Sequence, residues 1–118
     1  MKDLKVGMLQ IIPIEQDGKL ILKWEGECTE INSDEILTPY FNEIINNFNS
    51  SEMEIDFSTL KYMKSSTVPT LVKLITRLNK DKINTKIFYD DKSNWQTATF
   101  KALKSVVAIM THIEVIGI

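Results

Sequence analysis

The apolar residues of this chain follow the spacing of strands in some segments and that of helices in others. Residues 5–14 and 20–26 are rich in apolar and β-branched types, and the turn-forming run 16–19 separates them. An Asp-Gly pair between two apolar runs predicts an antiparallel hairpin. Pro13 has no N–H to give to a neighbouring strand, so we expect the first strand to lie at an edge there or to end.

The next segment has the spacing of an amphipathic helix, but its start has two interpretations. Ser33 can cap the helix, with Asp34 and Glu35 in the first turn. Alternatively, Thr38 is the cap and Pro39 the first helical residue, where a missing N–H costs nothing. We favour the second start, with 33–37 as an irregular lead-in. The predicted buried stripe is Ile36, Leu37, Tyr40, Phe41, Ile44, Ile45 and Phe48.

Two further helices are predicted. Pro69 is tolerated only in a first turn, which places the start of the second helix at Ser65 or Ser66. The third helix covers about 95–107. The second is expected to bury Val68, Leu71, Val72, Leu74, Ile75 and Leu78, and the third Trp95, Ala98, Thr99, Ala102, Leu103 and Val106.

Short strands are predicted at 53–57, 85–89 and 112–116, and 58–64 is interpreted as a loop. The order is β-β-α-β-α-β-α-β. Strands that alternate with helices predict an α/β fold with right-handed crossovers and a mixed, largely parallel sheet that begins with a hairpin and carries about three helices. We interpret residues 1–118 as a single domain.

Composition excludes several classes of protein. One cysteine, Cys28, leaves no internal disulfide, and with one histidine, His112, no common His/Cys zinc site can be assembled. The net charge of −2 disfavours nucleic-acid binding. No stretch approaches the roughly 20 apolar residues of a membrane span, and the start lacks the pattern of a secretion signal. We therefore expect a cytoplasmic protein without metal or cofactor.

Candidate functional residues follow two of the parallel strands. Ligands and partners of alternating α/β folds gather at the carboxyl ends of the strands, so Lys64, Ser65, Ser66 and Thr67 are expected to lie near Asp90 and Asp91. A serine at a helix start can cap the helix, and it can equally be a phosphorylation site. The simplest interpretation of Asp90 and Asp91 is that they belong to a solvated loop. No acid, base and nucleophile recur at a defined spacing, so no enzyme is predicted.

Two segments resemble the STAS domains, the family of anti-sigma-factor antagonists. Gly26-Glu27-Cys28-Thr29-Glu30-Ile31 is similar to the strand exit of these domains. The segment 54–66, from Glu-Ile-Asp-Phe-Ser to Lys-Ser-Ser, is similar to their strand and serine signature. The resemblance covers about residues 15–118. It implies a STAS-like fold and a small, non-enzymatic regulatory protein.

The resemblance also implies a switch. The serine that opens the second helix of these domains is phosphorylated by a partner kinase of the anti-sigma, GHKL type, and a phosphatase reverses the modification. That serine corresponds to Ser65, with Ser66 beside it. Lys64, Thr67, Asp90 and Asp91 would then form the surrounding partner surface. Lys64 stands where the family has Asp and Thr67 where it has Gly, which reverses the charge beside the acceptor.

Other functions remain open from the sequence. The run 62–66 resembles, with one residue fewer, the loop of SpoIIAA-like proteins that activate diguanylate cyclases when unphosphorylated. A second alternative is a small-molecule module that binds a nucleotide or a lipid between the loops 58–66 and 90–94. A third is a degenerate STAS scaffold that is never phosphorylated.

Overall fold

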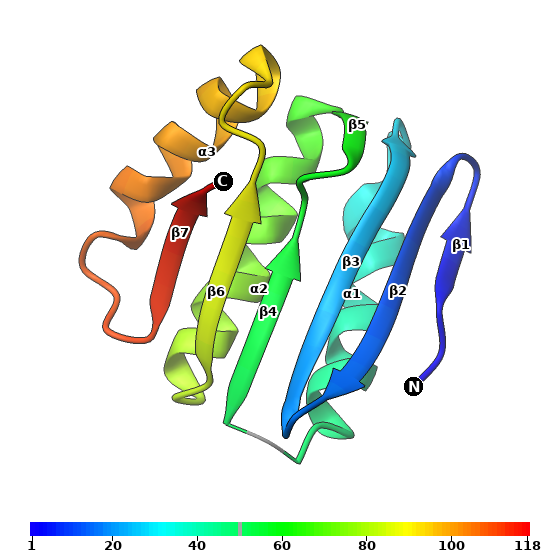
Figure 1. The fold of residues 1–118 in the computed structure, drawn as a ribbon. Coiled ribbons are helices and arrows are strands. Elements are labelled where there is room, and N and C mark those ends of the chain that lie inside the picture. The colour runs from blue at the N-terminus through cyan, green and yellow to red at the C-terminus, as the bar shows by residue number, and fades with distance from the viewer. Residues whose placement is uncertain (50) are drawn as a thin grey trace.

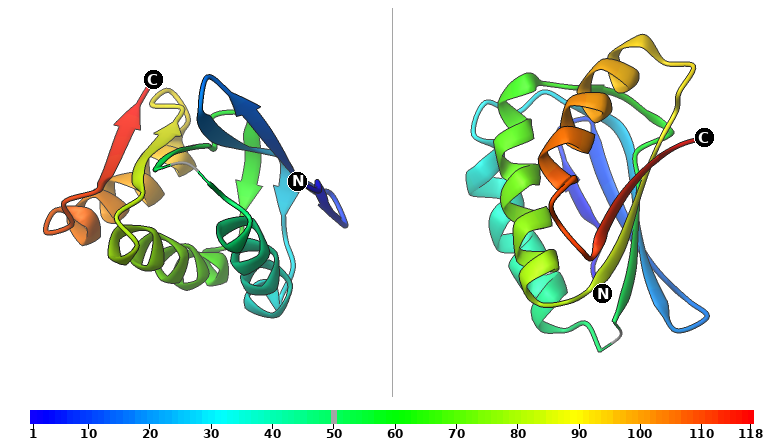
Figure 2. Two further views of the ribbon diagram at one scale, coloured as in Figure 1. Left: turned by 90° about the horizontal axis from the view of Figure 1, so that it is seen from below. Right: turned by 90° about the vertical axis from the view of Figure 1, so that its left-hand side faces the viewer.

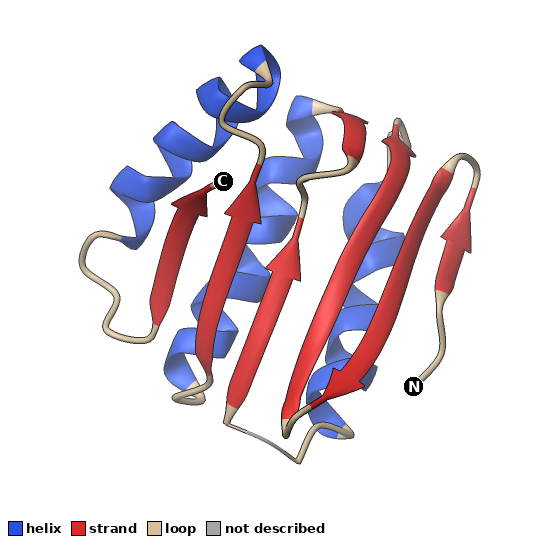
Figure 3. Cartoon of the chain, in the orientation of Figure 1, coloured by secondary structure: helices blue, strands red, loops and turns tan. Residues whose placement is uncertain are grey.

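The computed structural model describes residues 1–49 and 51–118, which form one mixed sheet and three α-helices (Figures 1 and 3). A short 3-10 helix, η1, precedes the second α-helix. The elements in chain order are β1 (Leu4–Val6), β2 (Leu9–Gln16), β3 (Lys19–Cys28), α1 (Ser33–Asn46), β4 (Glu52–Asp56), β5 (Leu60–Met63), η1 (Ser65–Thr67), α2 (Val68–Lys80), β6 (Asn84–Tyr89), α3 (Asn94–Val107) and β7 (Ile113–Gly117).

The sheet has the order β1-β2-β3-β4-β6-β7, and β5 pairs with β3. The pairs β1–β2 and β2–β3 are antiparallel, and β3–β4, β3–β5, β4–β6 and β6–β7 are parallel. The predicted fold class, a largely parallel α/β sheet that begins with a hairpin, is confirmed.

All three α-helices cover the same face of the sheet (Figure 2). Side chains that alternate along the central strands point into the layer between sheet and helices, where Trp24 packs against the rings of Phe41 and Phe57. In the described part of the chain, no helix covers the opposite face of the sheet. The protein is therefore a two-layer α/β structure.

The start of the chain forms two strands rather than the single strand predicted over 5–14. Gly7 adopts a positive φ of 57° and turns the chain back, so that β1 pairs with residues 9–11 of β2. Pro13 lies beyond this pairing, where β2 bonds only to β3. The expectation of an edge position at Pro13 is confirmed, and the strand continues past it.

The segment 58–64 was predicted to be a loop, and this is wrong. Residues 60–63 form β5, which pairs with the last residues of β3. Leu60 and Met63 are buried. The strand escaped prediction because only these two of its four residues face the core, which is too short a run for an alternating pattern.

Helix α1 begins at Ser33, so the start favoured from the sequence, Thr38 with Pro39, is wrong. Leu37 is buried in the core, and the first turn of the helix carries it there. A carboxylate oxygen of Asp34 accepts hydrogen bonds from the hydroxyl of Thr38 (3.0 Å) and the ammonium of Lys73 (2.9 Å) on α2. These contacts offset the backbone hydrogen bond that Pro39 cannot make inside the helix.

Helix α3 is rotated relative to the prediction. It buries Gln96, Phe100, Leu103 and Val107. Of the residues predicted to face inward, only Leu103 is buried; Trp95 and Thr99 are partly buried, and Ala98, Ala102 and Val106 are exposed. Two overlapping apolar stripes run along this helix, and the sequence pattern alone does not distinguish them.

None of the helices in residues 1–49 and 51–118 combines the length and apolar character needed to cross a membrane.

Candidate functional site

The candidate site lies where β3, β5 and β6 end. β4 leaves β3 after Asp56, whose carboxylate accepts hydrogen bonds from the N–H (2.9 Å) and the hydroxyl (2.6 Å) of Ser58. This turn directs the chain sideways, and β5 then continues along β3 through the pairs Glu27–Tyr62 and Cys28–Met63. The replacement of one strand by another carries the serine segment to the upper end of the sheet (Figure 1).

Backbone hydrogen bonds hold the serine turn. The N–H of Lys64 donates to the carbonyl of Cys28 (2.8 Å), and the N–H of Thr67 donates to the carbonyl of Lys64 (2.9 Å). Ser65 and Ser66 are exposed on this turn, and Lys64 is partly buried. The turn is thus fixed through its backbone while both serine side chains face solvent.

The capping role expected for Ser65 or Ser66 is not observed. The capping residue is Lys64 for η1 and Thr67 for α2, and neither helix start carries a side-chain cap hydrogen bond. Within the described residues, both serine hydroxyls are free of hydrogen bonds to the protein. They are available for chemistry or for a partner.

Thr67 was predicted to belong to the partner surface, and the structure contradicts this. Its side chain is 0% exposed, and its hydroxyl oxygen lies 3.5 Å from the sulfur of Cys28 in a buried hydrogen bond. Burial raises the pKa of the Cys28 thiol, although the hydrogen bond to Thr67 opposes the shift. Both residues therefore belong to the floor beneath the serine turn, and the thiol stays protonated and unreactive.

The two acidic residues have different roles. The carboxylate of Asp90 accepts the N–H of Lys92 (2.9 Å), and its backbone carbonyl accepts the N–H of Ser93 (3.1 Å), so Asp90 shapes the loop before α3. Asp91 is exposed, and its N–H donates to the carbonyl of Ile118 (3.3 Å). Among residues 1–49 and 51–118, no three His, Cys, Asp or Glu side chains form a group suited to a metal ion.

Gln96 joins the two loops of the site, a role that no pattern in the sequence indicates. Its side-chain NH₂ donates to the carbonyls of Phe57 (2.8 Å) and Leu60 (2.9 Å), and its oxygen accepts the N–H of Asp90 (2.7 Å). The residue is 1% exposed. Gln96 was absent from the residues predicted to face inward, because α3 was predicted in the wrong rotation.

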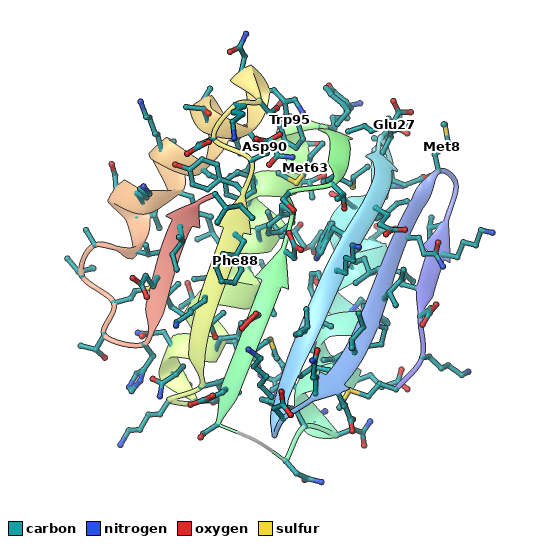
Figure 4. The ribbon with its side chains drawn as sticks, in the orientation of Figure 1. Met8, Glu27, Met63, Phe88, Asp90 and Trp95 are labelled. Carbon is teal, nitrogen blue, oxygen red and sulfur yellow. The ribbon has the colours of Figure 1, made fainter. Side chains whose placement is uncertain are left out.

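An aromatic pair lies beside the serine turn. Tyr62 on β5 is 46% exposed, and its ring centre lies 6.4 Å from that of the partly buried Trp95. Figure 4 shows Trp95, Asp90 and Met63 together at one end of the sheet, with Glu27 and Met8 farther along the same edge. The structure thus places the serine segment and the 90–94 loop at a common edge, as the sequence predicted.

The three largest cavities described lie elsewhere. One of about 500 Å³ is lined by residues at the starts of β4, β6 and β7, including His112. One of about 430 Å³ lies at the 15–19 turn and the end of α1, and one of about 260 Å³ lies between α1 and α2. None of these three is lined by residues of 58–66 or 90–94, the place predicted for a small ligand.

Comparison with solved structures identifies the fold. An anti-sigma factor antagonist from Mycobacterium paratuberculosis superimposes with a TM-score of 0.66 at 13% identity, covering 90% of this chain and 85% of that one. The anti-sigma factor antagonist SpoIIAA in its unphosphorylated form gives 0.60 at 14% identity, covering 92% and 87%.

A third similar structure is the complex of the diguanylate cyclase SiaD with its activator SiaC from Pseudomonas aeruginosa. The matched chain superimposes with a TM-score of 0.66 at 13% identity, and 98% of each chain is covered. No protein-family model and no curated protein sequence matches this chain significantly. The chain has the SpoIIAA-like fold, and the resemblance to STAS domains is confirmed at the level of the fold.

Proposed function

We propose that this chain is a non-enzymatic regulatory module that binds a protein partner at the β3–β5–β6 edge, and that phosphorylation of Ser65 controls the binding, with Ser66 as the second acceptor. The observation that carries the proposal is the pair of exposed serine hydroxyls, free of protein hydrogen bonds, on a backbone-fixed turn of a SpoIIAA-like fold. Proteins with this fold include antagonists of anti-sigma factors and a cyclase activator.

The proposed switch is electrostatic. A phosphate on Ser65 adds nearly two negative charges at neutral pH, three residues after Tyr62, whose ring is exposed. A partner that packs on Tyr62 and Trp95 would then face a charge it must desolvate. The Lys64 side chain is close enough in sequence to pair with the phosphate. The bond from Lys64 N–H to Cys28 holds the turn in place in both states.

The proposed partner surface consists of Lys64, Asp91 and the rim of the Asp90 loop, together with Tyr62 and Trp95. Asp90 contributes through the shape of the loop, since its carboxylate already accepts the Lys92 N–H. A kinase of the anti-sigma type would phosphorylate the serine, and a phosphatase would restore it. Support for these partners comes from the resemblance and from the fold.

Phosphosite mapping on the protein purified from its own cells tests the proposal. Intact mass and peptide mass spectrometry should find one added phosphate on Ser65 or Ser66. The phosphate should disappear in the variant Ser65→Ala, or in Ser66→Ala if Ser66 is the acceptor. Protein that stays unmodified through growth and stress would contradict the switch.

A second test measures the affinity of the protein for a partner isolated by pull-down from its own cells. Ser65→Asp should lower the affinity for the partner by about tenfold or more relative to wild type. Ser51→Asp is a matched control, because Ser51 is exposed and precedes β4 at the opposite end of the sheet. Equal binding by Ser65→Asp and wild type would favour a degenerate scaffold instead.

Activation of a diguanylate cyclase is a second candidate function. The chain and the matched chain of the SiaD–SiaC complex cover each other over 98% of their lengths. The unphosphorylated protein should then raise the rate of cyclic dinucleotide synthesis by a cyclase from the same organism, and Ser65→Asp should not. A cyclase whose rate is the same with and without the protein would exclude this candidate for that pair.

A further inference from the structure

Helix α3 has a second apolar face that nothing in the described structure covers. Its buried face packs on the sheet through Phe100, Leu103 and Val107. On the solvent side, and in the turn that follows the helix, lies a second stripe with a spacing of four, four and three residues. We call it the outer stripe, and it consists of Ala98, Ala102, Val106 and Ile109.

The outer stripe has the shape of a helix-docking surface. Ala98 and Ala102 are small and exposed, so a second helix can approach the α3 backbone closely. Val106 and Ile109, 42% and 91% exposed, supply apolar area at the carboxyl end. Its helical part, Ala98 to Val106, spans about 12 Å at 1.5 Å per residue, a little over two turns, and Ile109 in the following turn extends it. Apolar anchors at these spacings are how one amphipathic helix recognises another.

The charge around the stripe indicates the chemistry of the occupant. Residues 92–112 contain Lys92, Lys101 and Lys104 and no Asp or Glu, in a chain whose net charge is −2. The ammonium of Lys104 lies 5.5 Å from the centre of the Tyr89 ring, towards the sheet, so Lys101 is the lysine of α3 that flanks the outer stripe. In the described part of the chain, none of these three lysines is paired with a carboxylate.

Helices α1 and α2 pair through opposite charges, whereas α3 lacks such a neighbour among the residues that the structure describes. Helix α1 carries only acidic charges and α2 only basic ones. The two are joined by the ion pair between Lys73 and Asp34 (2.9 Å) and by the hydrogen bonds of Arg77 to Asn42 (2.6 Å) and Asn46 (2.9 Å). Helix α3 is basic like α2, but within residues 1–49 and 51–118 no acidic helix lies beside it.

We propose that the outer stripe of α3 docks an acidic amphipathic helix of a protein partner. The proposal is independent of serine phosphorylation, because it concerns a different surface. A second copy of this chain fits less well, because pairing two α3 helices about Ala102 brings lysines against lysines. An anionic membrane also fits less well, because Val106 and Ile109 are the two large apolar side chains that the outer stripe offers for insertion.

A displayed library of helical peptides tests the proposal directly. The library is selected on the full-length protein, with counter-selection on the double variant Val106→Ser/Ile109→Ser. Enriched peptides should carry Asp or Glu beside apolar residues spaced three and four apart. A synthetic peptide from this set should bind the double variant at least about tenfold more weakly than wild type. Raising the salt concentration from about 50 mM to about 500 mM should also lower the affinity of the peptide for the wild-type protein.

Matched variants separate the stripe from general surface effects. Ile31→Ser removes an apolar side chain that is 77% exposed in a different place, and it should bind like wild type. Lys101→Glu should lose binding about tenfold, whereas Lys5→Glu on β1 should not. These three positions are all exposed, so each of the three variants should melt within about 2 °C of wild type.

Four results would overturn the proposal. The first is enrichment of basic or uncharged peptides, or a failure of the library to enrich at all. The second is equal binding by wild type and the Val106→Ser/Ile109→Ser variant. The third is sedimentation of wild type, but not of this variant, with phosphatidylglycerol vesicles, which would assign the stripe to a membrane. The fourth is a dimer of wild type in sedimentation velocity that the variant abolishes, which would assign it to a second copy.

Discussion

At the scale of single residues, two glycines with similar backbone angles have unequal importance. Gly26 and Gly18 both adopt positive φ, 83° and 78°. A Cβ on Gly26 would lie 1.9 Å from the carbonyl oxygen of Met8, in a backbone segment that also accepts the N–H of Glu27 (3.1 Å). A Cβ on Gly18 would meet nothing within 4 Å.

We predict that Gly26→Ala destabilises the protein much more than Gly18→Ala. The second variant carries only the strain of positive φ, about 1 kcal/mol. The first adds a clash with backbone that must shift, so its loss should exceed about 3 kcal/mol. Denaturant unfolding of both variants measures the difference. Similar losses would mean that β1 and β2 can move away from Gly26 freely.

Tyr40 gives the protein a pH dependence in alkaline solution. Burial raises the pKa of its hydroxyl from about 10 to about 12, and the hydroxyl donates to the carbonyl of Lys2 (2.8 Å). Because the folded pKa lies above the unfolded one, the neutral form stabilises the fold. This contribution is complete below pH 10 and is lost as the pH rises towards 12.

The variant Tyr40→Phe should therefore show a smaller fall in the free energy of unfolding between pH 10 and pH 12 than wild type. Lysines titrate in both proteins, so the difference between the two curves isolates Tyr40. Chemical denaturation at several pH values measures it. Parallel curves would show that Tyr40 ionises without cost in the folded state.

At the scale of elements, the start of α1 shows how tertiary contacts override a local preference. Pro39 at a first helical position is the better local solution. The structure instead places it in the second turn, because Leu37 is buried and Asp34 accepts hydrogen bonds from Thr70 (3.3 Å) and Lys73 on α2. The helix thus retains a residue that weakens it.

Pro39→Ala should accordingly stabilise the protein, by about 1 kcal/mol or more. The new N–H can donate to the carbonyl of Glu35, one turn earlier, and the clash of the proline ring disappears. Pro39 is exposed, so no core contact is lost. Thermal unfolding of the variant measures the gain. An unchanged or lowered melting temperature would favour a helix that begins at Thr38.

At the scale of the whole molecule, Gln96 connects two loops that lie about 30 residues apart in the chain. Its one side chain bonds to the β4–β5 turn and to the loop after β6. The serine turn follows β5, and Asp91 follows Asp90. The relative position of the two halves of the candidate site therefore depends on a buried amide in α3.

Gln96→Met keeps the volume but removes three hydrogen bonds, those to the carbonyls of Phe57 and Leu60 and the one from the N–H of Asp90. The Phe57 carbonyl keeps the N–H of Leu60 as a donor (3.0 Å). We predict a loss of about 2–4 kcal/mol in stability. Hydrogen exchange should become faster at residues 57–64 and 90–93, more than elsewhere in the sheet. Gln16→Met on the exposed end of β2 is the control. A uniform increase in exchange would mean that Gln96 supports the whole fold rather than this edge.

The class of fold, and the edge of the sheet at which the candidate residues lie, could be predicted from the order and spacing of the residues alone. The hairpin, the three helices and the later strands are readable because burial on one face imposes a period of two or about 3.6 residues on the chain. The order of these elements then fixes a parallel sheet and brings 64–66 and 90–91 to one edge. The resemblance in 26–31 and 54–66 is confirmed at the level of the fold.

The choice between competing local patterns depends on contacts between segments that are distant in the chain. β5 exists because β4 leaves β3 and vacates its edge, an event without a local signature. Thr67 is buried because it lies over Cys28, a contact across 39 residues. The rotation of α3 satisfies the hydrogen bonds of Gln96 at the expense of exposing Val106. In each case the deciding free energy comes from contacts between distant segments, which the spacing of residues along the chain does not record.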